Sequence, residues 1–144
     1  MIRTMLLGCL FLAGIGALAC QSYTNTLVES PGRVDERVAL STLRSIASAQ
    51  TAYSITNSGA YGSFEQLVAG GHLDSRFSSS QPRIGGYVMT MTVAGGTDGS
   101  YYCNADPDAA SNQKGRHFYL SSASPEIRVN LTKAATASDE VFQP

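Results

Sequence analysis

Hydrophobic residues change their spacing twice along the chain. Residues 5–19 are all apolar or small and carry no charge. From residue 34 to about 56, apolar and small side chains recur mostly at every third or fourth position, whereas short segments between 87 and 130 alternate bulky and polar residues. The first pattern is typical of an export signal, the second of an amphipathic helix and the third of half-buried strands.

The spacing over 34–56 predicts one long helix. Asp35 and Glu36 are expected in its first turn, where the helix dipole favours negative charge, and the residues 57–59 are expected to end it. The apolar stripe comprises Val34, Val38, Leu43, Ile46, Ala47, Ala49 and Tyr53. The opposite face, expected to be solvated and without a partner, carries Arg37, Ser41, Arg44, Ser45, Ser48 and Gln50.

Short segments after this helix predict an antiparallel sheet. The four expected strands are 87–93, 100–105, 117–120 and 126–130. Before them, Ser63 is expected to cap a short helix over 64–69, which Gly70 and Gly71 would end. The fold class is therefore α+β, with one long N-terminal helix packed on an antiparallel sheet of about four strands.

The apolar segment 5–19 follows a short start that carries a single positive charge, Arg3. A membrane-spanning helix needs about 20 apolar residues, and the polar residues 21–26 stop this segment short of that length. The pattern predicts a signal peptide over 1–19 that is removed after export.

The end of the signal, Ala17-Leu18-Ala19-Cys20, resembles the lipobox of bacterial lipoproteins. This resemblance implies cleavage between Ala19 and Cys20, with fatty acyl chains such as palmitate then anchoring Cys20 to the membrane. Gln21 stands where Asp often favours retention in the inner membrane, so the resemblance implies the outer membrane, facing the periplasm or the surface. Ordinary signal-peptidase cleavage at the same bond, giving a free periplasmic or secreted protein, is the alternative. The expected organisation is a signal peptide (1–19), a lipid-anchored flexible tether (20–33), a globular domain (34–132) and a flexible tail (133–144).

Composition and motifs exclude several functions. Ten basic against eleven acidic residues give the 144-residue chain a formal charge of -1, so nucleic-acid binding is not expected. His72 and His117 lie in different expected elements without metal-ligand spacing, and no serine elbow or phosphate loop is present. Cys103 has no partner once Cys9 is removed and Cys20 is acylated, so it is expected to be a buried structural thiol. We therefore expect no catalytic residue and no cofactor.

Several motifs together resemble the globular heads of type IV pilin-like and pseudopilin-like proteins. They are LRSIASAQTAY (43–53), GSFEQL (62–67), GHLD (71–74), GYVMT (86–90), GRHFY (115–119) and IR (127–128). The resemblance extends from about residue 34 to 131. It implies a helix packed on a sheet of about four antiparallel strands, in a non-catalytic subunit of a fibre or secretion machine.

The start of the chain departs from that family. It has no prepilin cleavage motif, and Ser30, Pro31 and Gly32 are expected to break any helix that continues from the apolar segment. The resemblance therefore implies a pilin-like head on a lipoprotein anchor, which binds another envelope, pilus or secretion protein. A minor pilin or pseudopilin of a type IV pilus or type II secretion system is one alternative. A small periplasmic ligand-binding protein or enzyme, with a pocket near Cys103, Asp106 and His117, is the other.

Polar residues in two expected turns could supply oxygen ligands to calcium, as a loop beside the sheet does in pseudopilin heads. These residues are Asp98, Asp106, Asp108 and Asn112. Their spacing does not match an EF-hand, and turn formation alone accounts for them. We therefore expect no metal site.

Overall fold

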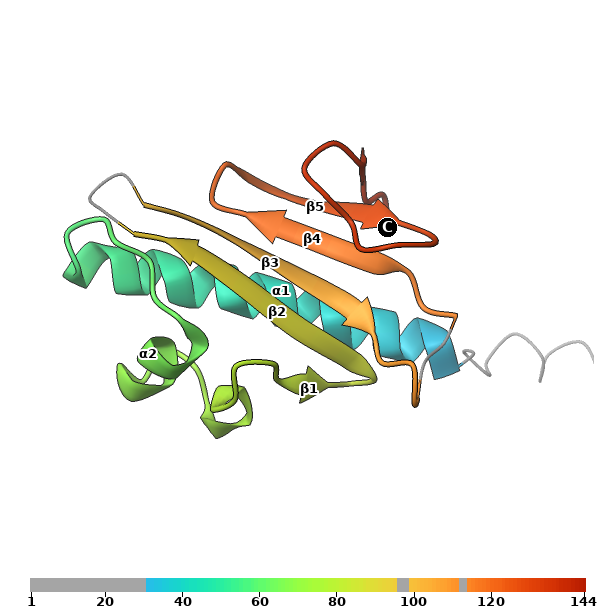
Figure 1. The fold of residues 1–144 in the computed structure, drawn as a ribbon, viewed down its shortest axis with the longest axis horizontal. Coiled ribbons are helices and arrows are strands. Elements are labelled where there is room, and N and C mark those ends of the chain that lie inside the picture. Colours follow the sequence, from blue (N-terminus) through green and yellow to red (C-terminus); the bar gives the residue numbers. More distant parts are fainter. Residues whose placement is uncertain (1–30, 96–98, 112–113) are drawn as a thin grey trace, which may run out of the picture.

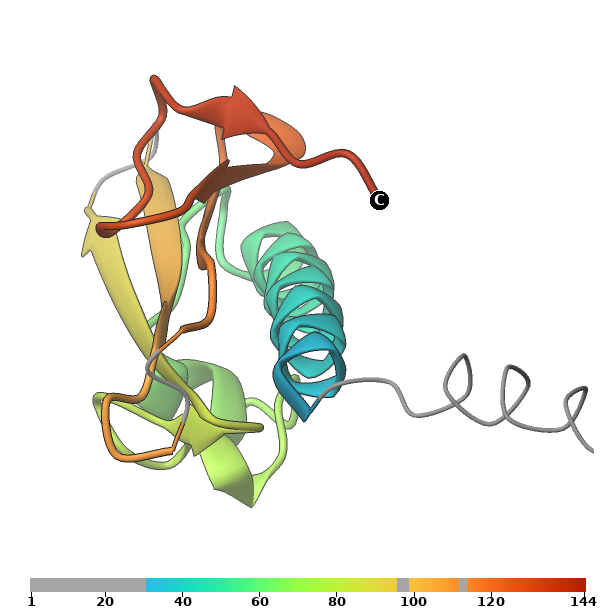
Figure 2. The same cartoon turned by 90° about the vertical axis from the view of Figure 1, so that its right-hand side faces the viewer.

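The computed structural model describes residues 31–95, 99–111 and 114–144. One long helix lies along one face of an antiparallel sheet, so that the two form two layers (Figures 1 and 2). The elements are α1 (Pro31–Thr56), α2 (Phe64–Ala69), the 3-10 helix η1 (Ser75–Phe77), β1 (Arg83–Ile84), β2 (Tyr87–Ala94), β3 (Ser100–Pro107), β4 (His117–Ser121), β5 (Ser124–Asn130) and β6 (Glu140–Val141). The strand order is β1-β2-β3-β4-β5-β6, so each strand pairs with its neighbours in sequence.

The α+β class is confirmed, but the expected number of about four strands is wrong because the sheet has six. The four expected segments correspond to β2, β3, β4 and β5. The additional strands, β1 and β6, have two residues each, which is too short to produce an alternating pattern. β1 pairs with β2 because the chain reverses at Gly85 and Gly86, whose φ angles of 57° and 73° suit glycine.

β6 lies within residues 133–144, for which the sequence analysis expected a flexible tail. The Phe142 ring meets the Phe118 ring edge to face, with centroids 5.7 Å apart. The Phe142 N–H also donates to the Ile127 carbonyl at 2.8 Å. An aromatic side chain thus packs this segment against the sheet.

α1 begins at Pro31, three residues before the expected start at residue 34. Pro31 and Gly32 are the first two residues of α1, so an interruption between the apolar segment and Val34 can lie only before Pro31. Proline is tolerated in a first turn because the N–H that it lacks has no helical partner there. Ser30 and the other residues of the expected tether before Pro31 lie outside the described residues.

The core lies between α1 and the sheet. Ala39, Leu43 and Ile46 follow one another at spacings of four and three and are fully buried. They pack in one cluster with sheet residues that include Tyr87, Met89, Cys103, Ala105, Phe118 and Leu120. Burial of each large apolar side chain contributes about 1.5–3 kcal/mol, so this layer contact is a large contribution to the stability of the fold.

Gln50 lies on the buried side of α1 and not on the face expected in water, with an exposed fraction of 0%. It follows the buried Ile46 by four residues and therefore shares its side of the helix. Its Nε2 donates to the Gly62 carbonyl at 2.6 Å, and its Oε1 accepts from the Gly62 N–H at 2.9 Å. This amide joins the end of α1 to the segment before α2, where Ser63 caps α2 as predicted.

Candidate functional site

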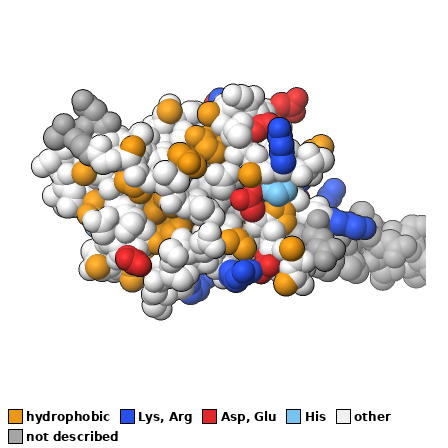
Figure 3. All heavy atoms as spheres, viewed as in Figure 1, with side chains coloured by type: hydrophobic (Ala, Val, Ile, Leu, Met, Phe, Trp, Pro, Cys, Tyr) orange, Lys and Arg blue, Asp and Glu red, His pale blue; other side chains and the backbone are white. Residues whose placement is uncertain are grey.

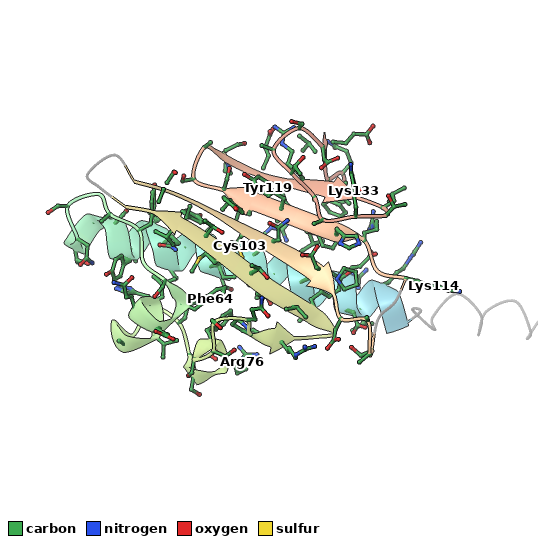
Figure 4. The ribbon with its side chains drawn as sticks, viewed as in Figure 1. Phe64, Arg76, Cys103, Lys114, Tyr119 and Lys133 are labelled. Carbon is green, nitrogen blue, oxygen red and sulfur yellow. The ribbon has the colours of Figure 1, made fainter. Side chains whose placement is uncertain are left out.

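Two of the three side chains that an enzymatic interpretation requires lie together. His117 Nδ1 and Asp106 Oδ1 are 2.6 Å apart on the sheet face opposite α1, with 22% and 31% of the side chains exposed. Cys103, which Figure 4 labels, is fully buried, and because side chains alternate along a strand it lies on the face of β3 opposite to Asp106. The three side chains therefore do not form one site.

The environment of Cys103 suits an inert thiol. Burial raises the pKa of this thiol strongly, and the negative charge of Asp106 adds to the shift. A reactive cysteine needs its thiolate form, which a positive and partly open environment would favour. Cys103 packs instead with the apolar core between α1 and the sheet, in the structural role expected from the sequence.

His72 lies in a different part of the fold from the His117–Asp106 pair. It follows α2 and meets the Tyr53 ring of α1 edge to face, with ring centroids 5.8 Å apart. It also lines a hollow of about 290 Å³ between α1 and the α2–η1 segment, together with Asp74 and Arg76. Asp74 and Arg76 bind each other at 2.8 Å. The two histidines thus lie in separate environments.

The residues considered for calcium are only partly described. Asp98 and Asn112 lie outside the described residues. Asp106 contacts His117, whereas Asp108 forms an ion pair with Arg83. Hydrogen bonding from Arg83 lowers the pKa of Asp108, with a further contribution from the Ala110 N–H. Within the described ranges, no three histidine, cysteine, aspartate or glutamate side chains are grouped so that they could hold a metal ion.

The expected cleavage and lipidation residues, Ala19 and Cys20, lie outside the described residues. In the part of the chain that the structure describes, no helix combines the length and apolar character needed to cross a membrane.

The sheet face opposite α1 carries a pair of tyrosines. Tyr102 and Tyr119 stack across β3 and β4, with centroids 5.7 Å apart and ring planes inclined by 25°. Few charged side chains lie over the middle of β2 and β3 on this face (Figure 3). The segment between β5 and β6 packs on the same face, where the Asn104 amide donates to the Ala135 carbonyl at 2.8 Å. Figure 2 shows this segment and α1 on opposite sides of the sheet.

A groove of about 500 Å³ lies between the first half of α1 and the segment after β6. We call it the arginine groove, after four of its lining residues. It is lined by Arg33, Glu36, Arg37, Leu40, Arg44, Arg116, Phe142, Gln143 and Pro144. Arg37 and Arg44 were expected on a solvated face of the helix, and the sequence does not predict a groove there. The groove depends on tertiary packing, which the sequence pattern does not reveal, because Arg116 and Phe142 come from the other end of the chain.

Arg116 joins the two walls of the arginine groove. Its guanidinium binds the Glu36 carboxylate at 2.7 and 3.1 Å, and its backbone N–H donates to the same carboxylate at 3.3 Å. Burial acts to raise the pKa of Glu36, but the hydrogen bonds and charge of Arg116 outweigh it, so this pKa lies below its ordinary value. The guanidinium also lies over the Phe142 ring, 5.0 Å from its centroid. Arg116 is therefore fixed by a carboxylate on one side and an aromatic ring on the other.

Comparisons with protein-family models, with curated proteins and with solved structures found no match to this chain.

Proposed function

We propose that this protein is an exported, lipid-anchored protein of the bacterial cell envelope, with a pilin-like head that binds another protein. The observation that carries the proposal is Cys20, which directly follows the apolar segment 5–19 and the small residue Ala19. α1 begins eleven residues after Cys20. An extended chain of that length reaches at most about 40 Å, so the lipid would keep the head near the membrane surface.

The arrangement of the head supports a binding role without catalysis. A long helix covering one face of an antiparallel sheet agrees with the helix-then-sheet order that the pilin resemblance implies. The groups considered for catalysis are divided between the two faces of β3, with Cys103 on one and Asp106 on the other. The head would thus act by presenting its surfaces to a partner.

Incorporation of labelled palmitate tests the anchor. In the native host, we expect label in the wild-type protein and none in Cys20→Ser. Cys9→Ser is the matched control, because it removes the cysteine within the signal peptide and should leave the label unchanged. Label that persists in Cys20→Ser, or a mature wild-type protein whose mass includes no lipid, would contradict the proposal.

A minor pilin or pseudopilin is the second candidate, and one observation favours it. α1 begins at Pro31, three residues nearer to the apolar segment than expected, so less chain separates the helix from that segment. Mass spectrometry of the mature N-terminus separates the two candidates. Retention of residues 5–19 would favour the pilin subunit, whereas a chain that begins with acylated Cys20 would favour the lipoprotein.

A further inference from the structure

We propose that the arginine groove binds an acidic segment of a partner protein. This inference rests on the proposed role as a protein-binding module, but it does not depend on the lipid anchor. It goes beyond that role because it assigns the surface and the chemistry of the partner.

The first wall of the groove is a stripe of arginines on α1. Arg33, Arg37 and Arg44 are separated by four and seven residues, so successive turns place them on the same side of the helix. The stripe extends about 17 Å along the helix axis, and Leu40 lies within it. This length suits a segment of several residues in extended conformation better than a single small anion.

The second wall comes from the end of the described chain and from the residue before β4. Phe142 supplies an aromatic surface, and Gln143 and Pro144 continue the wall beyond β6. Arg116 is held between Phe142 and Glu36, which is the only carboxylate side chain among the lining residues that the structure describes. Four arginine side chains and one carboxylate side chain line the groove, so these side chains together give it a positive charge.

Carboxylates of a protein segment fit this groove better than a membrane surface does. Guanidinium groups bind carboxylates through two parallel hydrogen bonds, and such pairs strengthen when they are partly shielded from water. The groove is recessed between α1 and the segment after β6, and it includes the partly buried Phe142 ring. A membrane surface is flat and contacts charges that protrude from a protein. A peptide chain can instead enter a recess and cover the apolar side chains inside it.

The test measures binding of the full-length protein, in detergent, to a dye-labelled peptide of alternating glutamate and glycine. We expect binding that weakens with added salt, and no binding of the same peptide with glutamine in place of glutamate. The double substitution Arg33→Gln, Arg44→Gln should weaken binding about tenfold or more, because it removes two charge-assisted contacts. The control is Arg76→Gln, Lys133→Gln, which removes two exposed positive charges outside the groove and should leave the affinity unchanged.

Three results would overturn the proposal: no binding of the glutamate peptide, an equal loss in both double variants, or displacement of the peptide by glycerol phosphate as effectively as by unlabelled peptide. The last result would assign the groove to phosphate headgroups. Palmitate labelling of Cys20 is read separately, so a failed peptide assay with labelled Cys20 would reject the groove and keep the anchored protein. If the wild-type protein carries no palmitate label but still binds the peptide, the result would reject the lipid anchor and keep the groove.

Discussion

The Glu36 carboxylate of α1 holds the Arg116 guanidinium, eighty residues later in the chain, through hydrogen bonds of 2.7 and 3.1 Å. This pair ties the first turns of the helix to the residue before β4. We expect Glu36→Gln to lower the free energy of unfolding at neutral pH by about 1–2 kcal/mol, because the variant loses charge-assisted hydrogen bonds at a partly buried site. Chemical denaturation of both proteins measures the difference.

The same pair predicts a pH dependence. The pKa of Glu36 in the folded protein lies below its ordinary value of 4.5, so the folded state binds fewer protons than the unfolded state around that pH. The stabilisation is therefore present above about pH 4.5 and is lost as the pH falls through the folded-state pKa. The stability difference between wild type and Glu36→Gln should shrink over this range, whereas Glu65→Gln, at an exposed position of α2, should cause little change at any pH. A difference for Glu36→Gln that stays constant down to acid pH would contradict the role of the charge.

Gly85 lies directly against Val38 of α1, and a Cβ atom at Gly85 would overlap the Val38 side chain. Its φ of 57° is also unfavourable for other residues. We expect Gly85→Ala to destabilise the protein by more than the roughly 1–2 kcal/mol that positive φ alone costs. Thermal and chemical unfolding test this. Gly71→Ala separates the two causes, because Gly71 has a φ of 72° but no neighbouring atom within 4 Å of the place that a Cβ would occupy.

If Gly85→Ala destabilises the Val38→Ala variant much less than it destabilises the wild type, the contact with the Val38 side chain is the larger cause. If Gly85→Ala cost no more than Gly71→Ala, close packing of the β1–β2 turn on α1 would not matter for stability.

Gln50 binds both backbone groups of Gly62 from a fully buried position. Replacement by leucine keeps a similar size but leaves a buried N–H and C=O without partners, at a cost of about 1–3 kcal/mol for each group. We expect Gln50→Leu to lower the melting temperature and to accelerate amide hydrogen exchange at Gly62. Ser48→Ala, at an exposed position of the same helix, serves as the control. Normal exchange at Gly62 in Gln50→Leu would mean that water or another group replaces the amide.

The sequence predicts the parts of the fold whose pattern repeats over several residues. Ala39, Leu43 and Ile46 repeat with the period of a helix, and β2 and β3 are long enough for alternation to be visible. The polarity of Gln50 favours the solvated face, but its spacing of four residues from Ile46 places it on the buried side of the helix. β1 and β6 contain too few residues to carry a pattern, and they form only because β2 and β5 are there to pair with them.

The sequence alone predicts some features of the candidate sites, whereas others depend on tertiary contacts. Opposite placement of Cys103 and Asp106 follows from strand alternation, since the two residues are an odd number of positions apart. The spacing of Arg33, Arg37 and Arg44 was also visible in the sequence, but the wall formed by Arg116 and Phe142 was not. A groove between segments so distant in the chain requires the packing of the C-terminal segment to be known.

The burial of Cys103 predicts its reactivity towards thiol reagents. Because burial raises the pKa of this thiol and encloses it, we expect no reaction with a disulfide reagent in the native protein and full reaction after denaturation. If Cys9 is removed with the signal and Cys20 is acylated, Cys103 is the single thiol that denaturation exposes. Reaction in the native state would contradict the burial, and additional thiols after denaturation would contradict the proposed processing.

Phe142 is one of the residues that hold the C-terminal segment on the sheet, through Phe118, Arg116 and the Ile127 carbonyl. Phe142→Ala should lower the free energy of unfolding by about 1.5–3 kcal/mol, because the variant loses apolar burial and the cation–π contact. Amide exchange in β6 should accelerate, since the ladder there has only two residues. Gln143→Ala, at the exposed neighbouring position, is expected to change neither quantity. Unchanged exchange in β6 of Phe142→Ala would show that the pairing with β5 and the hydrogen bonds from Arg128 and Asn130 to Asp139 hold the segment without the ring.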